Sequence, residues 1–404
     1  MKTIKSLLLT ALCLAAASFT NGCSGNAGQF EVENGRIVKG DKPYYYIGTN
    51  LWYASELAVS DPGRLVKELD TLKALGLDNL RILATDENFE GMDIVLDELG
   101  KRDMSAVLYL NNAWEWSEDG YRSYLEKAGN GKQPHPAIDG YEAYTEAMSK
   151  FASDKKAVEL FRRHVERVVT RYKDRAEIFS WQICNEPRPF TRGEASDKAY
   201  IDYIQGTARL IKSLDPDHLV STGNEGSMGC EGDINFFEKV HDCPDIDYLT
   251  IHIWPYNWGW IDPTDVEGGV SQAIDKTNGY IKEHLDVARR LGKPAVIEEF
   301  GYPRDGFAYA DTTLTSGRDE YYRFVFSQVL SSAKENGPLA GCNFWSWSGY
   351  ARQTPGHQFW QKGDDLCGDP FQEAQGLNSV YLRDTTTIEV IKEFTGNLSF
   401  KASE

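Results

Sequence analysis

The sequence predicts an α/β fold, specifically a (β/α)8 barrel (TIM barrel) with long loops on the face where such barrels carry their active sites. Eight strand-like segments alternate with eight helix-like segments along the 404 residues. A count of eight favours a closed barrel over a doubly wound open sheet, because closure leaves no exposed edge strand. The long irregular segments all follow strands, whereas connections from helix to strand are short. These long segments are residues 112–157, 301–318 and 348–386.

The predicted strands are short runs of apolar and β-branched residues that end at polar residues, glycine or proline. The fourth strand ends before Pro187, which has no N–H with which to continue a central ladder. Ahead of the first strand, residues 30–46 are predicted to form a hairpin with Gly40 and Asp41 at its turn. In chain order the predicted strands are residues 44–50, 78–83, 105–111, 179–184, 218–222, 248–254, 294–300 and 339–347.

The predicted helices show apolar residues at helical spacing. The first has Asp61 as a capping residue and Pro62 at its first position, where a missing N–H costs nothing. In chain order the predicted helices are residues 62–75, 92–102, 158–172, 199–214, 236–240, 270–291, 319–334 and 387–394.

The amino terminus is typical of an export signal ahead of a single domain. Lys2 and Lys5 precede an apolar run that is too short to span a bilayer. We therefore predict a signal peptide at residues 1–22 and one barrel domain over residues 23–404, which no repeat, linker or composition break divides. The residues before Cys23 resemble a bacterial lipoprotein cleavage site. They predict a lipid-anchored protein of the outer surface or periplasm, with plain secretion as the alternative.

Five cysteines follow Cys23, an odd number without the regular spacing of a disulfide framework. Cys184 and Cys342 fall inside predicted strands and are interpreted as small core residues. Cys230 and Cys243 are the one candidate pair for a disulfide.

Charge and motifs exclude several classes of function. The formal net charge of −18 argues against nucleic acid or an anionic membrane surface as a partner. The sequence has no His-Glu-x-x-His, Gly-x-Ser-x-Gly, Cys-x-x-Cys or phosphate-binding glycine loop, and its seven histidines lack metal-ligand spacing. We therefore predict no cofactor and no metal.

Tryptophans gather near the ends of predicted strands. Flat aromatic faces suit the apolar faces of sugars, and core packing alone would place tryptophans among the helices too. The pattern therefore predicts a sugar-binding cleft. The residues are Trp52, Trp114, Trp116, Trp254, Trp258, Trp260, Trp345, Trp347 and Trp360.

Two strand ends carry carboxylates. Glu186 follows the fourth predicted strand and Glu299 ends the seventh, so a closed barrel brings both to one mouth. Two carboxylates with distinct roles are what glycoside hydrolysis needs, although a strand-end glutamate can also merely cap a turn. Strand alternation lets only one of Glu298 and Glu299 face the interior. We assign Glu299, close to Gly301, to the mouth and expect Glu298 to point outward to the helices.

Three more residues belong near these carboxylates. Arg81, in the second predicted strand, could pair with Glu299 and hold it ionised, or form an ordinary structural ion pair. His252 and Trp254 close the sixth strand on the same face. A lone histidine there is more often structural, but beside two carboxylates it is a plausible hydrogen-bond partner for one of them or for a sugar hydroxyl.

With these residues assembled, the chain resembles glycoside hydrolase family 5, and within it the β-mannanases, over residues 30–396. The motifs that carry the resemblance are specific in combination. They are Trp-Gln-Ile-Cys-Asn-Glu-Pro-Arg at 181–188, Glu-Phe-Gly at 299–301, Gly-Thr-Asn at 48–50, and Arg81, His252 and Trp345. Residues 111–114, Asn-Asn-Ala-Trp, are similar to an Asn-Asn-Trp segment of mannanases, with Ala113 interposed.

The resemblance implies a retaining endo-β-1,4-mannanase that acts on β-mannan polysaccharide or oligosaccharide. It implies that Glu186 is the acid/base and Glu299 the nucleophile, that Asn185 binds the sugar 2-hydroxyl, and that Trp345 forms a platform under the reacting sugar. Asn112 and Trp114, with Arg81, His252 and Trp254, complete the predicted substrate-binding set. Trp254 stands where many members have Tyr, which predicts one hydrogen bond fewer to Glu299. A β-1,4-glucanase and a non-catalytic glycan-binding surface protein are the alternatives.

Overall fold

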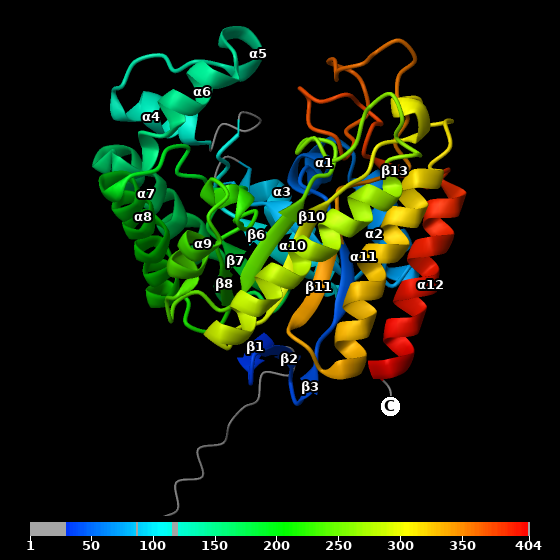
Figure 1. Ribbon diagram of the computed structural model, residues 1–404, viewed down its shortest axis with the longest axis horizontal. Helices are drawn as coiled ribbons and strands as arrows, with labels where there is room; N and C mark the ends of the chain where they lie inside the picture. Colours follow the sequence, from blue (N-terminus) through cyan, green and yellow to red (C-terminus); the bar gives the residue numbers. More distant parts are fainter. Residues whose placement is uncertain (1–29, 86–87, 115–119, 403–404) are drawn as a thin grey trace, which may run out of the picture.

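Eight parallel strands form the centre of the computed structural model, which describes residues 30–85, 88–114 and 120–402 (Figure 1). They pair in the order β8, β7, β6, β5, β4, β11, β10, β9. The end strands are joined by Asp247 N donating to Val220 O over 2.8 Å and by His252 N donating to Glu225 O over 3.1 Å. The predicted barrel is therefore confirmed. Its strands are β4 (Tyr46–Asn50), β5 (Asn79–Leu83), β6 (Ser105–Tyr109), β7 (Ile178–Gln182), β8 (Leu219–Ser221), β9 (Leu249–Ile253), β10 (Ala295–Phe300) and β11 (Leu339–Phe344).

Helices surround the strands, and each predicted helix is present, although the last one extends to Ala402 where the prediction ended at residue 394 (Figure 1). The Asp61 side chain accepts from Arg64 N, as the capping prediction requires. The helices are α1 (Ala54–Ser60), α2 (Pro62–Ala74), α3 (Phe89–Gly100), α4 (Tyr121–Ala128), α5 (Pro136–Asp139), α6 (Tyr141–Met148), α7 (Lys155–Tyr172), α8 (Glu194–Leu214), α9 (Ile234–His241), α10 (Val270–Leu291), α11 (Ser316–Glu335) and α12 (Thr385–Ala402), with 3-10 turns η1 (Phe151–Ser153), η2 (Met228–Cys230) and η3 (Asp305–Phe307).

A small antiparallel sheet closes the bottom of the barrel (Figure 1). It comprises β1 (Phe30–Glu33), β2 (Arg36–Lys39) and β3 (Lys42–Pro43). The predicted turn at Gly40 and Asp41 joins β2 to β3, and a second turn at Asn34 and Gly35 joins β1 to β2. The ring of Phe30 packs edge-on against Phe179 of β7, with ring centroids 4.8 Å apart. An apolar plug thus fills the lower interior and leaves the polar groups above it.

Strand β10 departs from regular alternation, and the predicted orientation of Glu298 is wrong. The register against β9 pairs Ile297 with Ile251 but Glu299 with His252, so Glu298 is an extra residue at a β-bulge. A bulge changes the side from which the next side chain emerges. Glu298 is fully buried and contacts Gln182 and Tyr248 inside the barrel. Both consecutive glutamates therefore face the interior.

The predicted disulfide is also wrong, because Cys230 and Cys243 are both free thiols. Cys230 ends η2 and Cys243 follows α9, so the eight residues of α9 lie between them. The Cys230 thiol lies 3.9 Å from Asn224 Oδ1 and the Cys243 thiol lies 3.9 Å from Asp245 Oδ2, so the two sulfur atoms have different neighbours.

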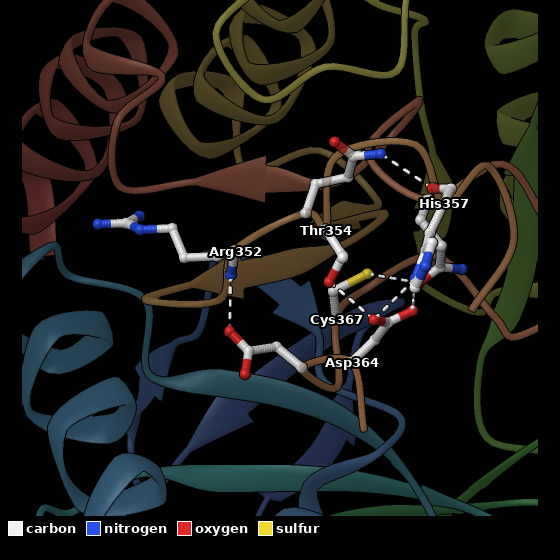
Figure 2. Close-up of a pocket in the computed structure, with 8 residues that line it drawn as sticks. Arg352, Thr354, His357, Asp364 and Cys367 are labelled. Atoms are coloured by element: carbon white, nitrogen blue, oxygen red, sulfur yellow. Dashed lines mark hydrogen bonds and ion pairs between the residues drawn. The ribbon is translucent and has the colours of Figure 1, made fainter. Parts of the chain in front are cut away.

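The long segments predicted after strands lie on one face of the barrel (Figure 1). The segment after β6 contains α4, α5 and α6, and the segment after β11 contains β12 (Trp347–Gly349) and β13 (Val380–Tyr381). Figure 2 shows a small polar pocket in the latter segment. There His357 Nδ1 lies 2.9 Å from Asp364, and Thr354 Oγ1 donates to the same carboxylate over 2.7 Å. These contacts join residues within the same segment, and no predicted site residue lines the pocket.

The predicted signal peptide, Cys23 and Trp116 lie outside the described residues. Among the helices of the described part of the chain, none combines the length and apolar character needed to cross a membrane.

Candidate active site

Glu186 is presented by a short backbone extension of β7. Beyond Gln182 the chain continues between its neighbours, with Asn185 N donating to Asn111 O over 2.7 Å and Glu186 N donating to Gly223 O over 3.0 Å. Glu186 itself has a φ of +49°, in the left-handed region. That conformation costs a non-glycine residue about 1–2 kcal/mol, so the surrounding hydrogen bonds hold the side chain in a place that a regular strand would not give it.

The two carboxylates meet at the mouth of the barrel, one from each of two strands that are not neighbours in the sheet. One oxygen of Glu186, one of Glu299 and Nδ1 of His252 all lie within 4.8 Å of one another. Glu186 is 9% exposed and Glu299 is 3% exposed. Retaining glycosidases place their carboxyl groups about 5–5.5 Å apart and inverting enzymes place them farther apart. The close approach of these two carboxylates fits the retaining class.

Glu299 accepts hydrogen bonds on both oxygens. Arg81 Nη1 donates to Oε1 in a buried ion pair, and Trp254 Nε1 donates to Oε2 over 3.3 Å. Burial raises the pKa of Glu299 well above its usual range, and the charge of Glu186 adds to that rise. Arg81 opposes both effects, because a guanidinium favours the ionised form of a carboxylate.

Arg81 is fully buried and fixed on every side. Its Nε donates to Gln182 Oε1 over 2.8 Å, Nη1 also donates to Asn50 Oδ1 over 3.0 Å, and Nη2 donates to Asn185 Oδ1 over 2.7 Å. The guanidinium lies 4.6 Å from the ring centre of Tyr109. A permanent positive charge is thereby locked beside Glu299.

Glu186 is held by donors that carry no permanent charge. Trp114 Nε1 donates to Oε2 over 2.5 Å, and His252 Nδ1 lies 2.9 Å from Oε1. Burial raises the pKa of Glu186, against the nearby charge of Arg188. Burial also lowers the pKa of His252 well below its usual value, so the imidazole is neutral. Its Nδ1 lies 3.4 Å from Glu299 Oε2 as well, which makes His252 a bridge between the carboxylates.

Trp254 does not cost Glu299 a hydrogen bond, so that prediction is wrong. The indole N–H donates where we expected the donor to be missing. The larger ring fits because residue 301 is glycine: a Cβ there would lie 2.6 Å from Trp254 Cζ3. The indole also meets Trp345 edge-on, with ring centroids 6.1 Å apart. Gly301, Trp254 and Trp345 together form one packed wall beside Glu299.

The other predicted residues join the same network. Asn112 Oδ1 accepts from Asn185 Nδ2 and from Trp114 N, each over 3.1 Å. Asn185 links this pair to Arg81, and Trp345, 2% exposed, adjoins through Trp254. The structure thus brings all the predicted site residues into one connected cluster.

Sequence reasoning missed Glu225, which forms a bidentate pair with Arg188. Arg188 Nη2 donates to Glu225 Oε1 over 2.6 Å, and Nε donates to Oε2. The guanidinium lies 5.6 Å from the ring centre of Trp114, so the pair sits beside the donor to Glu186. Glu225 follows β8 as Glu186 follows β7, and that strand-end position was the available indication.

Comparisons with known proteins agree with this geometry. A family model described as GH family 5 beta-mannosidase-like matches residues 28–90 and 85–403. The chain is 28% identical over 378 residues to a putative mannan endo-1,4-beta-mannosidase 9 of Oryza sativa subsp. japonica, covering 84% of this chain and 85% of that protein. It is 27% identical to mannan endo-1,4-beta-mannosidase 1 of Solanum lycopersicum, covering 80% of this chain and 84% of that protein.

Among solved structures, a glycoside hydrolase family 5 mannosidase from Rhizomucor miehei aligns with a TM-score of 0.83 at 29% identity. The alignment covers 93% of this chain and 99% of that one. A variant of that mannosidase was solved in complex with mannosyl-fructose. An endo-1,4-beta-mannanase from the same organism aligns with a TM-score of 0.65 at 20% identity, over 93% of this chain and all of that one, and shares the fold.

Proposed function

Because this chain belongs to the β-mannosidase-like group of glycoside hydrolase family 5, we propose that it is a retaining endo-β-1,4-mannanase acting on mannan polysaccharides or oligosaccharides. The observation that carries the proposal is the placement of Glu186 and Glu299, whose oxygens lie within 4.8 Å at the mouth of the barrel. A double displacement needs one carboxylate that is ionised and one that can carry a proton. Glu299 is paired with the cation Arg81, which favours its ionised form, whereas the hydrogen-bond partners of Glu186 are uncharged.

Glu299 is proposed as the nucleophile. Its carboxylate attacks the anomeric carbon and forms a covalent glycosyl-enzyme as the glycosidic bond breaks. Arg81 favours the ionised form and fixes Oε1, while Trp254 orients Oε2. A carboxylate held this way at both oxygens enters the reaction without first reorganising its surroundings.

Glu186 is proposed as the acid/base. It donates its proton to the leaving oxygen in the first step, and in the second it takes a proton from the water that releases the sugar. Its hydrogen-bond partners Trp114 and His252 are neutral and tolerate both protonation states. Arg81 favours the ionised form of Glu299. The negative charge on Glu299 in turn favours a proton on Glu186, because two adjacent carboxylates resist double ionisation.

The substrate-binding roles are assigned to the rest of the cluster. Asn185 is proposed to bind the 2-hydroxyl, with its amide oriented by Arg81 and Asn112. Trp345 is proposed to form the platform beneath the reacting sugar, supported by Trp254. The sequence pattern supports export by a signal peptide at residues 1–22, with lipidation at Cys23 or plain secretion as its two forms.

An exo-acting mannosidase is the second candidate. It is favoured by the description of the matching family model and by the higher TM-score of the Rhizomucor miehei mannosidase, 0.83 against 0.65 for the endo-mannanase. Both candidates share the chemistry proposed for Glu186 and Glu299. They differ in whether the cleft lets a chain extend past both ends of the cut.

Product analysis tests the proposal. We expect mannohexaose to give several internal products at early times, with reducing ends released from mannan and few from carboxymethylcellulose. Mannose appearing alone at first would select the exo-acting candidate. Preference for carboxymethylcellulose would select the glucanase alternative. Retention on a mannan column without products at any enzyme concentration would show a glycan-binding protein and reject hydrolysis.

A further inference from the structure

Glu298 is a buried carboxylate that the proposed reaction does not use. It immediately precedes Glu299 in the sequence and is fully shielded from solvent. The bulge in β10 directs its side chain into the barrel interior. Burying a carboxylate without partners is strongly unfavourable, so its surroundings should show what the group does.

Glu298 is surrounded by hydrogen-bond donors. The Tyr248 hydroxyl donates to Oε1 over 2.9 Å, and the Gln182 amide donates to Oε2. Arg81 Nε lies 4.0 Å from the same Oε2. Partners that donate favour the ionised form of a carboxyl group, against the burial that raises the pKa of Glu298.

Arg81 faces two carboxylates at once. It donates to Glu299 through Nη1 and to Gln182 Oε1 through Nε. Gln182 links Arg81 to Glu298, because its Nε2 donates a hydrogen bond to the Glu298 carboxylate. The charges of Arg81 and Glu298 act on Glu299 with opposite sign, so a negative charge on Glu298 offsets part of the stabilisation that Arg81 gives to ionised Glu299.

We infer that Glu298 is a positioning residue for Glu299: its charge, held beside Arg81 by Gln182 and Tyr248, offsets part of the stabilisation that Arg81 gives to the ionised nucleophile. The inference rests on the proposed function, which assigns the nucleophile to Glu299. It gives the bulge in β10 a purpose, since regular alternation would have moved this charge out of the barrel.

Other ionisable groups define the setting in which this charge acts. Tyr46 and Tyr248 also face Glu298, and burial raises the pKa of both, so they stay neutral. Glu299 is further influenced by Glu186 and Glu225. His252 and Tyr109 also lie beside Glu299 and are uncharged. Arg81 is therefore a cation that lies beside both glutamates.

The expected effect of Glu298→Gln has a definite sign. Hydrolysis requires ionised Glu299, so the acid limb of the kcat/KM profile follows its pKa. The substitution removes a negative charge and keeps the size of the side chain, so the stabilisation of ionised Glu299 by Arg81 is no longer offset by Glu298. The acid limb is expected to move to lower pH by about 1 unit. The alkaline limb, which follows Glu186, should move less.

The experiment measures kcat/KM on mannohexaose against pH for the wild type, Glu298→Gln and a control. Glu68→Gln neutralises a buried carboxylate on α2 that pairs with Arg64 over 3.0 Å, and its acid limb should not move. Glu298→Met, also uncharged, should reproduce the shift.

The outcomes separate cleanly. An unmoved acid limb in folded Glu298→Gln overturns the inference, as does an equal shift in Glu68→Gln, which would show that the shift does not come from the charge of Glu298. Failure of both uncharged variants to fold would assign Glu298 a purely structural role. An inactive wild type would instead reject the proposed function.

Discussion

Replacing Glu299 by alanine is expected to lower kcat on mannan by at least about 10⁴-fold, the loss seen when a nucleophile that acts in a concerted unit is removed. Neither Glu186 nor Glu298 is expected to take its place, because Glu186 is assigned to the leaving oxygen and Glu298 is enclosed behind Arg81 and Gln182. The measurement is initial reducing-end release at saturating mannan, with the unfolding temperature recorded in parallel.

Glu299→Gln is the matched control for this experiment. It keeps the shape of the side chain and a partner for Trp254, so the variant should remain folded while losing a similar amount of activity. Both variants should still bind mannohexaose, since the substrate contacts proposed for Asn185 and Trp345 remain. Activity within a factor of ten of the wild type in either variant would reject Glu299 as the nucleophile.

Replacing Glu186 by alanine is expected to lower kcat on mannan by about 10³-fold, within the range for loss of general acid–base catalysis. A sugar alkoxide is a poor leaving group and needs the proton that Glu186 supplies. An aryl mannotrioside with an acidic phenol does not, so its first turnover should remain fast while the glycosyl-enzyme accumulates. The measurement is the burst of phenol under pre-steady-state conditions.

Azide provides the control that separates the acid/base role of Glu186 from the nucleophile role of Glu299. It is an anionic nucleophile that needs no general base, so it should restore turnover of the aryl substrate by Glu186→Ala and yield a glycosyl azide. It should leave Glu299→Ala inactive as a retaining enzyme. Equal losses on mannan and on the aryl substrate, without rescue by azide, would contradict the assignment of Glu186 as acid/base.

The barrel and its mouth residues were predictable because they follow from strong local patterns. Each predicted strand and helix repeats an apolar period that the sequence displays, and Pro187 marks where β7 must stop. Parallel strands then carry Glu186 and Glu299 to the same edge, whatever their distance in the chain.

The errors arose where geometry depends on contacts that no local pattern encodes. A single extra residue in β10 moved Glu298 from the helix side to the barrel interior. The helices α4 and α6 have only eight residues each, too few to show a clear period, so the segment after β6 was predicted to be irregular. The hydrogen bond from Trp254 depends on the space left by Gly301, which is visible only in three dimensions.

The stereochemistry of the first product tests the central claim most directly. With one oxygen of Glu186 and one of Glu299 within 4.8 Å of each other, the carboxylates are close enough for a covalent intermediate, whereas inverting enzymes set them farther apart to admit a water. Proton NMR of mannohexaose hydrolysis, recorded before mutarotation, should show the β-anomer at the new reducing end. Initial release of the α-anomer would contradict the double displacement and with it the roles given to both glutamates.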